Sequence, residues 1–219
     1  MKVGTDGVLL GAWAEVRPTD RRILDIGTAT GLIALMMAQR APEARITGID
    51  LIDVAEARAN ADASAWGDRL HFEQCAVQEF VADEPFDLIL SNPPFFVDSL
   101  TCPDAGRTTA RHAVTLPYDD LCAAAVRLLA PDGRFALILP ASETERWLAT
   151  CRDRLRLVRR TDVRTTPRRA PKRVLLECVH AAAAAPDRPL CDELVIGTGE
   201  HECYTPAYRA LTGDFYLKF

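Results

Sequence analysis

The sequence lacks any uninterrupted apolar run long enough to cross a bilayer, and its first residues contain no apolar core of a signal peptide. Seven cysteines are scattered along the chain without a Cys-x-x-Cys pair, and four histidines are dispersed without the spacing of metal ligands. These absences argue against a disulfide framework, and they predict reduced, mostly buried thiols and no metal site. We also expect a cytoplasmic protein without membrane association.

No internal repeat and no linker divides the chain, whose 219 residues are 48% hydrophobic and suffice for one buried core. We therefore expect a single domain over residues 1–219, acting as a monomer, with an N-terminal helix in residues 1–15 and a docked segment in residues 204–219. The net charge of −5 argues against a uniformly basic surface that wraps nucleic acid. Residues 152–173, however, contain ten Arg or Lys and two Asp, so they carry +8 and leave −13 to the rest of the chain. An acidic body with a basic edge is expected.

Apolar runs that predict strands alternate with runs that predict helices, as in an α/β protein with a doubly wound, Rossmann-like sheet. Two later strands, joined by a basic linker, predict a hairpin over residues 157–180, so the sheet is expected to be mostly parallel with an antiparallel C-terminal hairpin. A polar stretch, residues 98–113, predicts a long loop. The predicted strands are residues 22–27, 44–50, 70–75, 86–91, 134–139, 157–163, 173–180 and 194–196. The predicted helices are residues 32–40, 54–65, 116–130, 142–155 and 204–219, and a short helix beginning near Gly7 with Thr5 and Asp6 as candidate N-caps.

The motif Ser91-Asn92-Pro93-Pro94-Phe95-Phe96 follows the predicted buried strand 86–91. Asn92 precedes a proline and is biased to an extended backbone, and each proline holds its φ near −65°, so the loop is stiff. The Asn92 amide and the Pro93 carbonyl, fixed beside the ring of Phe95, can accept two hydrogen bonds from one planar exocyclic amine. The alternative interpretation is a proline-stabilised turn that closes a strand.

A second signal lies where the first predicted strand turns into a helix, at Gly27-Thr28-Ala29-Thr30-Gly31. Its glycines let the backbone approach a ligand closely, but their spacing is not the Gly-x-Gly-x-x-Gly of dinucleotide-binding turns, so NAD is disfavoured. Asp50 ends the second strand, where a carboxylate accepts hydrogen bonds from ribose hydroxyls. The alternative is that Asp50 merely starts a turn.

These residues together resemble the class I S-adenosylmethionine-dependent methyltransferases, namely the block from Asp25 to Gly31, Asp50 and Asn92-Pro93-Pro94-Phe95. The Asn-Pro-Pro-aromatic form is that of members acting on planar amines. The chain resembles one family more closely, the bacterial tRNA (adenine-37-N6)-methyltransferases that modify a valine tRNA. That similarity covers nearly the whole chain, and its blocks are residues 2–14, 91–96, 173–176 and 204–217.

The resemblance implies methyl transfer from S-adenosylmethionine to N6 of a flipped-out adenine in tRNA, with Phe95 stacked on the base. It further implies that Asp25 contacts the methionine end of the cofactor or orders the turn. Relatives often carry an acid after the third strand where this chain has Cys75-Ala76-Val77, so we expect backbone and apolar contacts to the adenine of the cofactor. The implied catalytic residues are Asn92, Pro93, Pro94 and Phe95. The implied cofactor-binding residues are Thr5, Asp6, Asp25, Gly27, Gly31, Asp50, Ala76, Val77 and Asn92. The implied RNA-binding residues are Arg107, Arg111, Arg168, Arg169 and Lys172.

Two other functions stay open at this point. The same tetrapeptide serves enzymes that methylate a protein glutamine amide or other bases; the basic hairpin favours RNA, unless it is only a solvated arginine-rich edge. A cofactor-binding or RNA-binding module without transfer activity is the second alternative, and the intact Asn92 and Asp50 argue against it.

Overall fold

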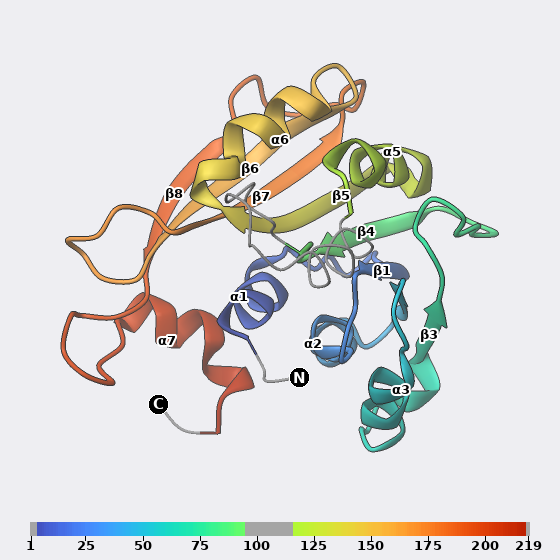
Figure 1. Cartoon of the computed structure of the whole chain (residues 1–219), viewed down its shortest axis with the longest axis horizontal. Helices are drawn as coiled ribbons and strands as arrows, with labels where there is room; N and C mark the ends of the chain where they lie inside the picture. Colours follow the sequence, from blue (N-terminus) through green and yellow to red (C-terminus); the bar gives the residue numbers. More distant parts are fainter. Residues whose placement is uncertain (1–3, 95–115, 218–219) are drawn as a thin grey trace, which may run out of the picture.

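The computed structural model describes residues 4–94 and 116–217, which build an eight-stranded mixed sheet flanked by helices (Figure 1). The strands are β1 (Arg22–Ile26), β2 (Arg45–Asp50), β3 (Leu70–Gln74), β4 (Phe86–Ser91), β5 (Leu129–Pro140), β6 (Leu155–Arg164), β7 (Arg173–His180) and β8 (Leu190–Val195). The α-helices are α1 (Thr5–Trp13), α2 (Leu32–Arg40), α3 (Ala55–Asp62), α5 (Tyr118–Leu128), α6 (Thr144–Cys151) and α7 (Pro206–Thr212). Short 3₁₀ helices are η1 (Gly67–Arg69), η2 (Ala141–Glu143) and η3 (Gly213–Phe215).

The strand order is β3-β2-β1-β4-β5-β7-β6-β8. Strands β1 to β5 pair in parallel, and β7 runs antiparallel to both β5 and β6. The last strand, β8, joins the edge by pairing in parallel with β6. This confirms the expected doubly wound sheet with an antiparallel C-terminal hairpin, because helices connect β1 to β2, β2 to β3 and β4 to β5, whereas a loop without a helix connects β3 to β4.

Side chains on alternate positions of the central strands face two separate cores. Ile23 of β1 and Leu88 of β4 belong to the core beneath α1, α2, α3 and α7, whereas Leu24 and Ile89 belong to the core beneath α5 and α6. Figure 1 shows these two groups of helices on opposite sides of the sheet. With both faces covered, the strands read as continuous apolar runs, which is why they were predictable from sequence.

Several predicted boundaries were wrong. Helix α1 begins at Thr5 and its N-cap is Gly4, so Thr5 and Asp6 lie in its first turn and neither caps it. The predicted C-terminal helix is limited to α7 and η3, and α7 is capped by the Thr205 hydroxyl, which accepts from the Tyr208 amide at 3.2 Å. Of the described cysteines, Cys122, Cys151 and Cys178 are buried as expected, but Cys191 is exposed.

The segment Pro131-Asp132-Gly133 lies within β5 and does not separate a helix from a strand as predicted. The register between β4 and β5 shifts from Phe86↔Leu129 to Leu88↔Arg134, so these three residues form an irregularity inside the strand, where a proline is tolerated. A Cβ on Gly133 would lie 2.8 Å from the carbonyl oxygen of Phe86, so only glycine fits this close approach. The preceding helix ends correspondingly early, at Leu128.

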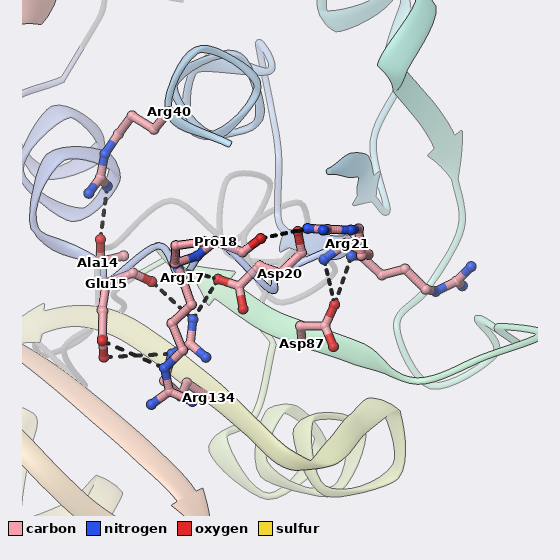
Figure 2. A network of polar contacts seen from close by, with 10 residues as sticks. Ala14, Glu15, Arg17, Pro18, Asp20, Arg21, Arg40, Asp87 and Arg134 are labelled. Atoms are coloured by element: carbon pink, nitrogen blue, oxygen red, sulfur yellow. Dashed lines mark hydrogen bonds and ion pairs between the residues drawn. The ribbon is translucent and has the colours of Figure 1, made fainter. Parts of the chain in front are cut away.

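A buried ion pair ties the loop before β1 to β5 (Figure 2). One Nη of Arg134 lies 2.7 Å from Oδ2 of Asp20, and both side chains are 2% exposed. Asp20 also accepts from the Arg17 amide at 2.8 Å, and Arg134 donates to the Glu15 carbonyl at 3.2 Å. On β4, Asp87 accepts from the amide of Arg21, directly before β1, at 2.7 Å and from that of Arg22, the first residue of β1, at 2.9 Å. These contacts fix the amino ends of three central strands.

Removing the Asp20 carboxylate should destabilise the protein strongly, because the buried Arg134 guanidinium would lose its closest counter-charge; the half-exposed Glu15 carboxylate lies farther away, at 3.9 Å. We expect Asp20→Ala to lower the free energy of unfolding by about 3–5 kcal/mol, measured by urea denaturation. The exposed Asp83 is the matched control, and Asp83→Ala should change stability by no more than about 0.5 kcal/mol. A loss below about 1 kcal/mol for Asp20→Ala would show that the pair is not needed.

Candidate active site

A cavity of about 460 Å³ lies at the carboxyl ends of the parallel strands. Because these ends share one edge of the sheet, segments far apart in the sequence meet there. Most of its lining residues lie at or directly after the end of a strand. They are Gly27 and Ala29 after β1, Asp50, Leu51 and Ile52 at the end of β2, Cys75, Ala76, Val77 and Gln78 after β3, and Asn92, Pro93 and Pro94 after β4. Asp6, Ile26, Ile49 and Leu116 complete the lining.

The glycine turn is anchored to the second strand. The amides of Gly27 and Thr28 both donate to the Ile49 carbonyl, at 2.9 and 3.0 Å. Gly27 has a φ of +77°, and a Cβ built on it would meet nothing within 4 Å, so open space lies over its backbone at the cavity. Gly31 has a different function, because it is the N-cap of α2 with a φ of +79°, lies close to Phe72 and does not line the cavity.

Asp50 is held by the turn that it helps to form. Its Oδ2 accepts from the Ala29 amide at 2.8 Å and its Oδ1 from the Ile52 amide at 3.1 Å. Each carboxylate oxygen can accept a second hydrogen bond, and the residue is half-buried in the cavity wall. Asp50 therefore both starts a turn and presents oriented acceptors to a ligand.

Asp25 lies beneath the turn and outside the cavity lining. It is fully buried, and the Thr28 hydroxyl donates to its Oδ2 at 2.7 Å. Burial raises the pKa of Asp25 to about 7, and the hydrogen bond from Thr28 opposes that shift. Of the two functions that the resemblance implied for Asp25, ordering the turn is the one that its contacts support.

One wall of the cavity is apolar, as expected from Cys75-Ala76-Val77. Burial raises the pKa of the Cys75 thiol to about 11, so this side chain is neutral at physiological pH. Leu51 and Ile52 extend the wall, and they are 53% and 46% exposed. Neither residue was predicted from sequence as part of the site, although two large apolar residues directly after the acid that ends a strand were a usable signal.

Asn92 lies at the end of β4. The preceding Ser91 is fully buried, and its hydroxyl donates to the Ile26 carbonyl of β1 at 2.9 Å. The Asn92 Oδ1 is buried and has no hydrogen-bond partner among the described residues. Such an acceptor costs about 1–3 kcal/mol unless something satisfies it, and because Asn92 also lines a cavity, this oxygen is available to a donor from a ligand.

A second cavity, of about 560 Å³, adjoins the first, and Asn92 and Asp6 line both. Pro93 and Pro94 line only the first cavity and Thr5 only the second. Of the residues expected to bind the cofactor, Thr5 therefore lines the second cavity and not the first. The other residues of the second cavity are Gly4, Leu9, Val163, Thr165, Lys172, Arg173, Ile196, Tyr204, Tyr208 and Tyr216.

Many charges of the basic hairpin are satisfied within the chain. Arg173 forms an ion pair with Asp6 at 2.8 Å, Arg160 pairs with Asp162 at 2.9 Å, and Arg164 pairs with Glu193. Arg159 lies over the Trp13 ring, with its guanidinium carbon 4.1 Å from the ring centroid. By contrast, the linker between β6 and β7 exposes its remaining cations. Arg168, Arg169 and Lys172 form no side-chain hydrogen bond or ion pair with any residue that the structure describes.

The expected site residues Phe95, Arg107 and Arg111 lie outside the described residues, and their functions stay predictions. Within residues 4–94 and 116–217 no cluster of three or more His, Cys, Asp or Glu is placed to hold a metal ion. In the same ranges no helix has the length and apolar character needed to cross a membrane.

The chain matches the family model "Methyltransferase small domain" over residues 5–146. It is 48% identical to the tRNA1(Val) (adenine(37)-N6)-methyltransferase of Phocaeicola vulgatus over 99% of this chain and 91% of the relative. Among solved structures, it superposes on a predicted O-methyltransferase from Agrobacterium tumefaciens with a TM-score of 0.72 and 19% identity, covering 95% of this chain and 96% of the other. A second fold neighbour is 1,6-didemethyltoxoflavin-N1-methyltransferase of Burkholderia thailandensis, solved with S-adenosylhomocysteine (TM-score 0.52, 21% identity, 74% and 71% coverage).

The first cavity fits S-adenosylmethionine, the cofactor of this methyltransferase fold. Open space lies over the Gly27 backbone, Asp50 presents a carboxylate for ribose hydroxyls, and Ala76 and Val77 provide an apolar wall for a base. The structural neighbours show the fold alone. The high identity to relatives over almost the whole chain shows the family. The chain belongs to the family of the tRNA1(Val) (adenine(37)-N6)-methyltransferases.

Proposed function

We propose that this protein transfers a methyl group from S-adenosylmethionine to N6 of an adenine in tRNA, at position 37 of a valine tRNA, in the cytoplasm. The names of its relatives support this substrate. The observation that carries the proposal is the buried, unpartnered Oδ1 of Asn92, which lies where two cavities meet. It is an acceptor for which the described residues supply no donor, and an exocyclic amine is such a donor.

The cofactor would lie across the strand ends and supply an electrophilic methyl group. In this arrangement Asp50 binds the ribose hydroxyls and the Gly27 backbone allows close approach. Ala76 and Val77 pack against the adenine of the cofactor, and Asp6 borders the cavity toward the substrate. Asp25 and Gly31 support the turn from beneath without touching the ligand, because neither lines the cavity.

The amine of adenine is a poor nucleophile because its lone pair is delocalised into the ring. Two acceptors, Asn92 Oδ1 and the Pro93 carbonyl, would hold the two amine hydrogens and favour a pyramidal nitrogen that points its lone pair at the methyl group. Pro93 and Pro94 limit the freedom of this loop, so orientation provides most of the rate enhancement. The alkylated nitrogen is strongly acidic and loses its proton to water, and no side chain is needed as a base.

The linker between β6 and β7 is the proposed contact with tRNA phosphates. Arg168, Arg169 and Lys172 are exposed and not neutralised by any described residue, whereas Arg164 and Arg173 are held in ion pairs. Phosphate contacts by such residues position an RNA without specifying its sequence. The valine tRNA would then be selected by other contacts.

The carboxylate of Asp50 is expected to hold the cofactor. Asp50→Ala should weaken binding of S-adenosylhomocysteine by about 10- to 100-fold in calorimetry, because hydrogen bonds to a charged group are lost. Asp62→Ala, an exposed acid at the end of α3, is the control and should bind normally. Tight binding of NADH without binding of S-adenosylhomocysteine would contradict the assignment.

The side chain of Asn92 is expected to act in the methyl transfer step and not in binding. Asn92→Ala should lower the single-turnover methylation rate by about 10²-fold or more, because one positioned polar group is lost in the transition state. Affinities for S-adenosylhomocysteine and tRNA should stay close to those of the wild type, since the backbone of the loop is fixed by its prolines. If the variant kept the wild-type rate at saturating enzyme, the proline motif would be a turn and the active site would lie elsewhere.

The basic linker between β6 and β7 is expected to contribute salt-dependent affinity for tRNA. Replacing Arg168, Arg169 and Lys172 with alanine should weaken tRNA binding and reduce the slope of log K against log salt by about one for each lost phosphate contact. Arg188, exposed before β8 at the end opposite the linker, is the matched control, and Arg188→Ala should leave the slope unchanged. An unchanged slope in the triple variant would show that the linker is only a solvated edge.

A further inference from the structure

We propose that the second cavity binds a nucleotide adjacent to the methylated adenosine, with its base stacked on the tyrosines of the C-terminal segment and its phosphate at Lys172. This inference rests on the proposed function, because it takes an RNA loop as the substrate. It gives a function to Tyr204, Tyr208 and Tyr216, which the methyl transfer itself does not use. The occupant is a nucleotide of the same RNA that carries the target adenine.

Three tyrosines form one aromatic wall of this cavity. The ring centroids of Tyr204 and Tyr208 are 5.3 Å apart with an interplanar angle of 32°, and those of Tyr208 and Tyr216 are 6.5 Å apart at 44°. Tyr208 is buried, and its hydroxyl lies 3.2 Å from that of Tyr216. Tyr204 and Tyr216 are half-buried, so each presents part of its ring to the cavity. Aromatic faces of this kind stack on unpaired bases.

The charges at the cavity suit a phosphate. Asp6 is the acid in its lining, and its Oδ2 lies 2.8 Å from Nε of Arg173, so its negative charge is balanced. Lys172 is exposed at the same cavity and is not paired with any described residue, which leaves a net positive charge. Thr165, also exposed in the lining, can add a neutral hydrogen bond.

The position of the cavity fits a neighbouring nucleotide and not the target base. The target amine is held by Asn92 and Pro93, and Pro93 and Pro94 line only the cofactor cavity. Asn92 lines both cavities, so the second cavity begins where the target amine is bound. Its volume of about 560 Å³ lies within the range of ligand pockets. Loop nucleotides are unpaired, and their bases can be splayed onto aromatic side chains.

The test combines changes in the protein with changes in the RNA. Full-length valine tRNAs carrying an abasic residue directly before or directly after adenosine 37 are compared with intact tRNA on the wild type, Tyr204→Ala and Tyr204→Phe. We expect Tyr204→Ala to raise the tRNA Kd by about 5- to 100-fold and Tyr204→Phe to bind nearly as the wild type, because phenylalanine keeps the stacking face. S-adenosylhomocysteine affinity, measured by calorimetry, should stay at the wild-type value in both variants and reports correct folding.

The coupling between the two changes decides the outcome. One of the abasic tRNAs should bind the wild type as weakly as intact tRNA binds Tyr204→Ala, and the two changes together should weaken binding no further. Fully additive effects, or equal wild-type affinity for intact and both abasic tRNAs, would overturn the inference. The comparison of wild-type affinity for intact and abasic tRNAs needs no variant, so it tests the inference even if Tyr204→Ala does not fold. Methylation of adenine by the wild type without this coupling rejects the inference alone, whereas absence of any adenine methylation by the wild type rejects the proposed function.

Discussion

The parallel seam between β1 and β4 is the constraint on which the site depends. Ile26 is paired with Ser91 in this register, and the buried hydroxyl of Ser91 donates to the Ile26 carbonyl at 2.9 Å. The next residues along the two strands are Gly27 and Asn92, so the glycine turn and the proline motif leave the sheet side by side. A slip of one residue would exchange the two faces of β4 and carry Asn92 away from the cavity. The pairing of β1 with β2 adds Asp50 to the same edge, through the bonds from Gly27 and Thr28 to Ile49.

The opposite end of the sheet keeps this seam in register. Asp87 accepts from the amides of Arg21 and Arg22 at the start of β1, and Asp20 and Arg134 join the preceding loop to β5 (Figure 2). These polar groups are far in sequence from one another, and the ion pair between Asp20 and Arg134 is almost completely buried. The structure therefore combines a hydrogen-bonded amino edge, which positions the strands, with a carboxyl edge whose polar groups remain available to ligands.

Sequence was sufficient for the central strands and for placing Gly27, Asp50 and Asn92 at their carboxyl ends. Strands covered on both faces are continuous apolar runs, and Gly27, Asp50 and Asn92 directly follow or end such runs. It was insufficient where tertiary pairing decides. Pro131 to Gly133 carry local turn signals, but strand pairing with β4 places them inside β5. The partners of Arg164 and Arg173 are distant in sequence, so a count of charges overstated the basic edge. Likewise, nothing in the spacing of Tyr204, Tyr208 and Tyr216 indicated that they line a cavity shared with Asn92.

Asn92 is the proposed acceptor for the amine of one adenine in tRNA, and the identity of the methylated nucleoside tests this most directly. Purified protein would be incubated with total bacterial tRNA and S-adenosylmethionine labelled in its methyl group, and the tRNA digested to nucleosides and resolved by mass spectrometry. The account predicts label in N6-methyladenosine, and label at position 37 of a valine tRNA when that species is isolated. Label in another nucleoside, or no label in tRNA at all, would contradict it.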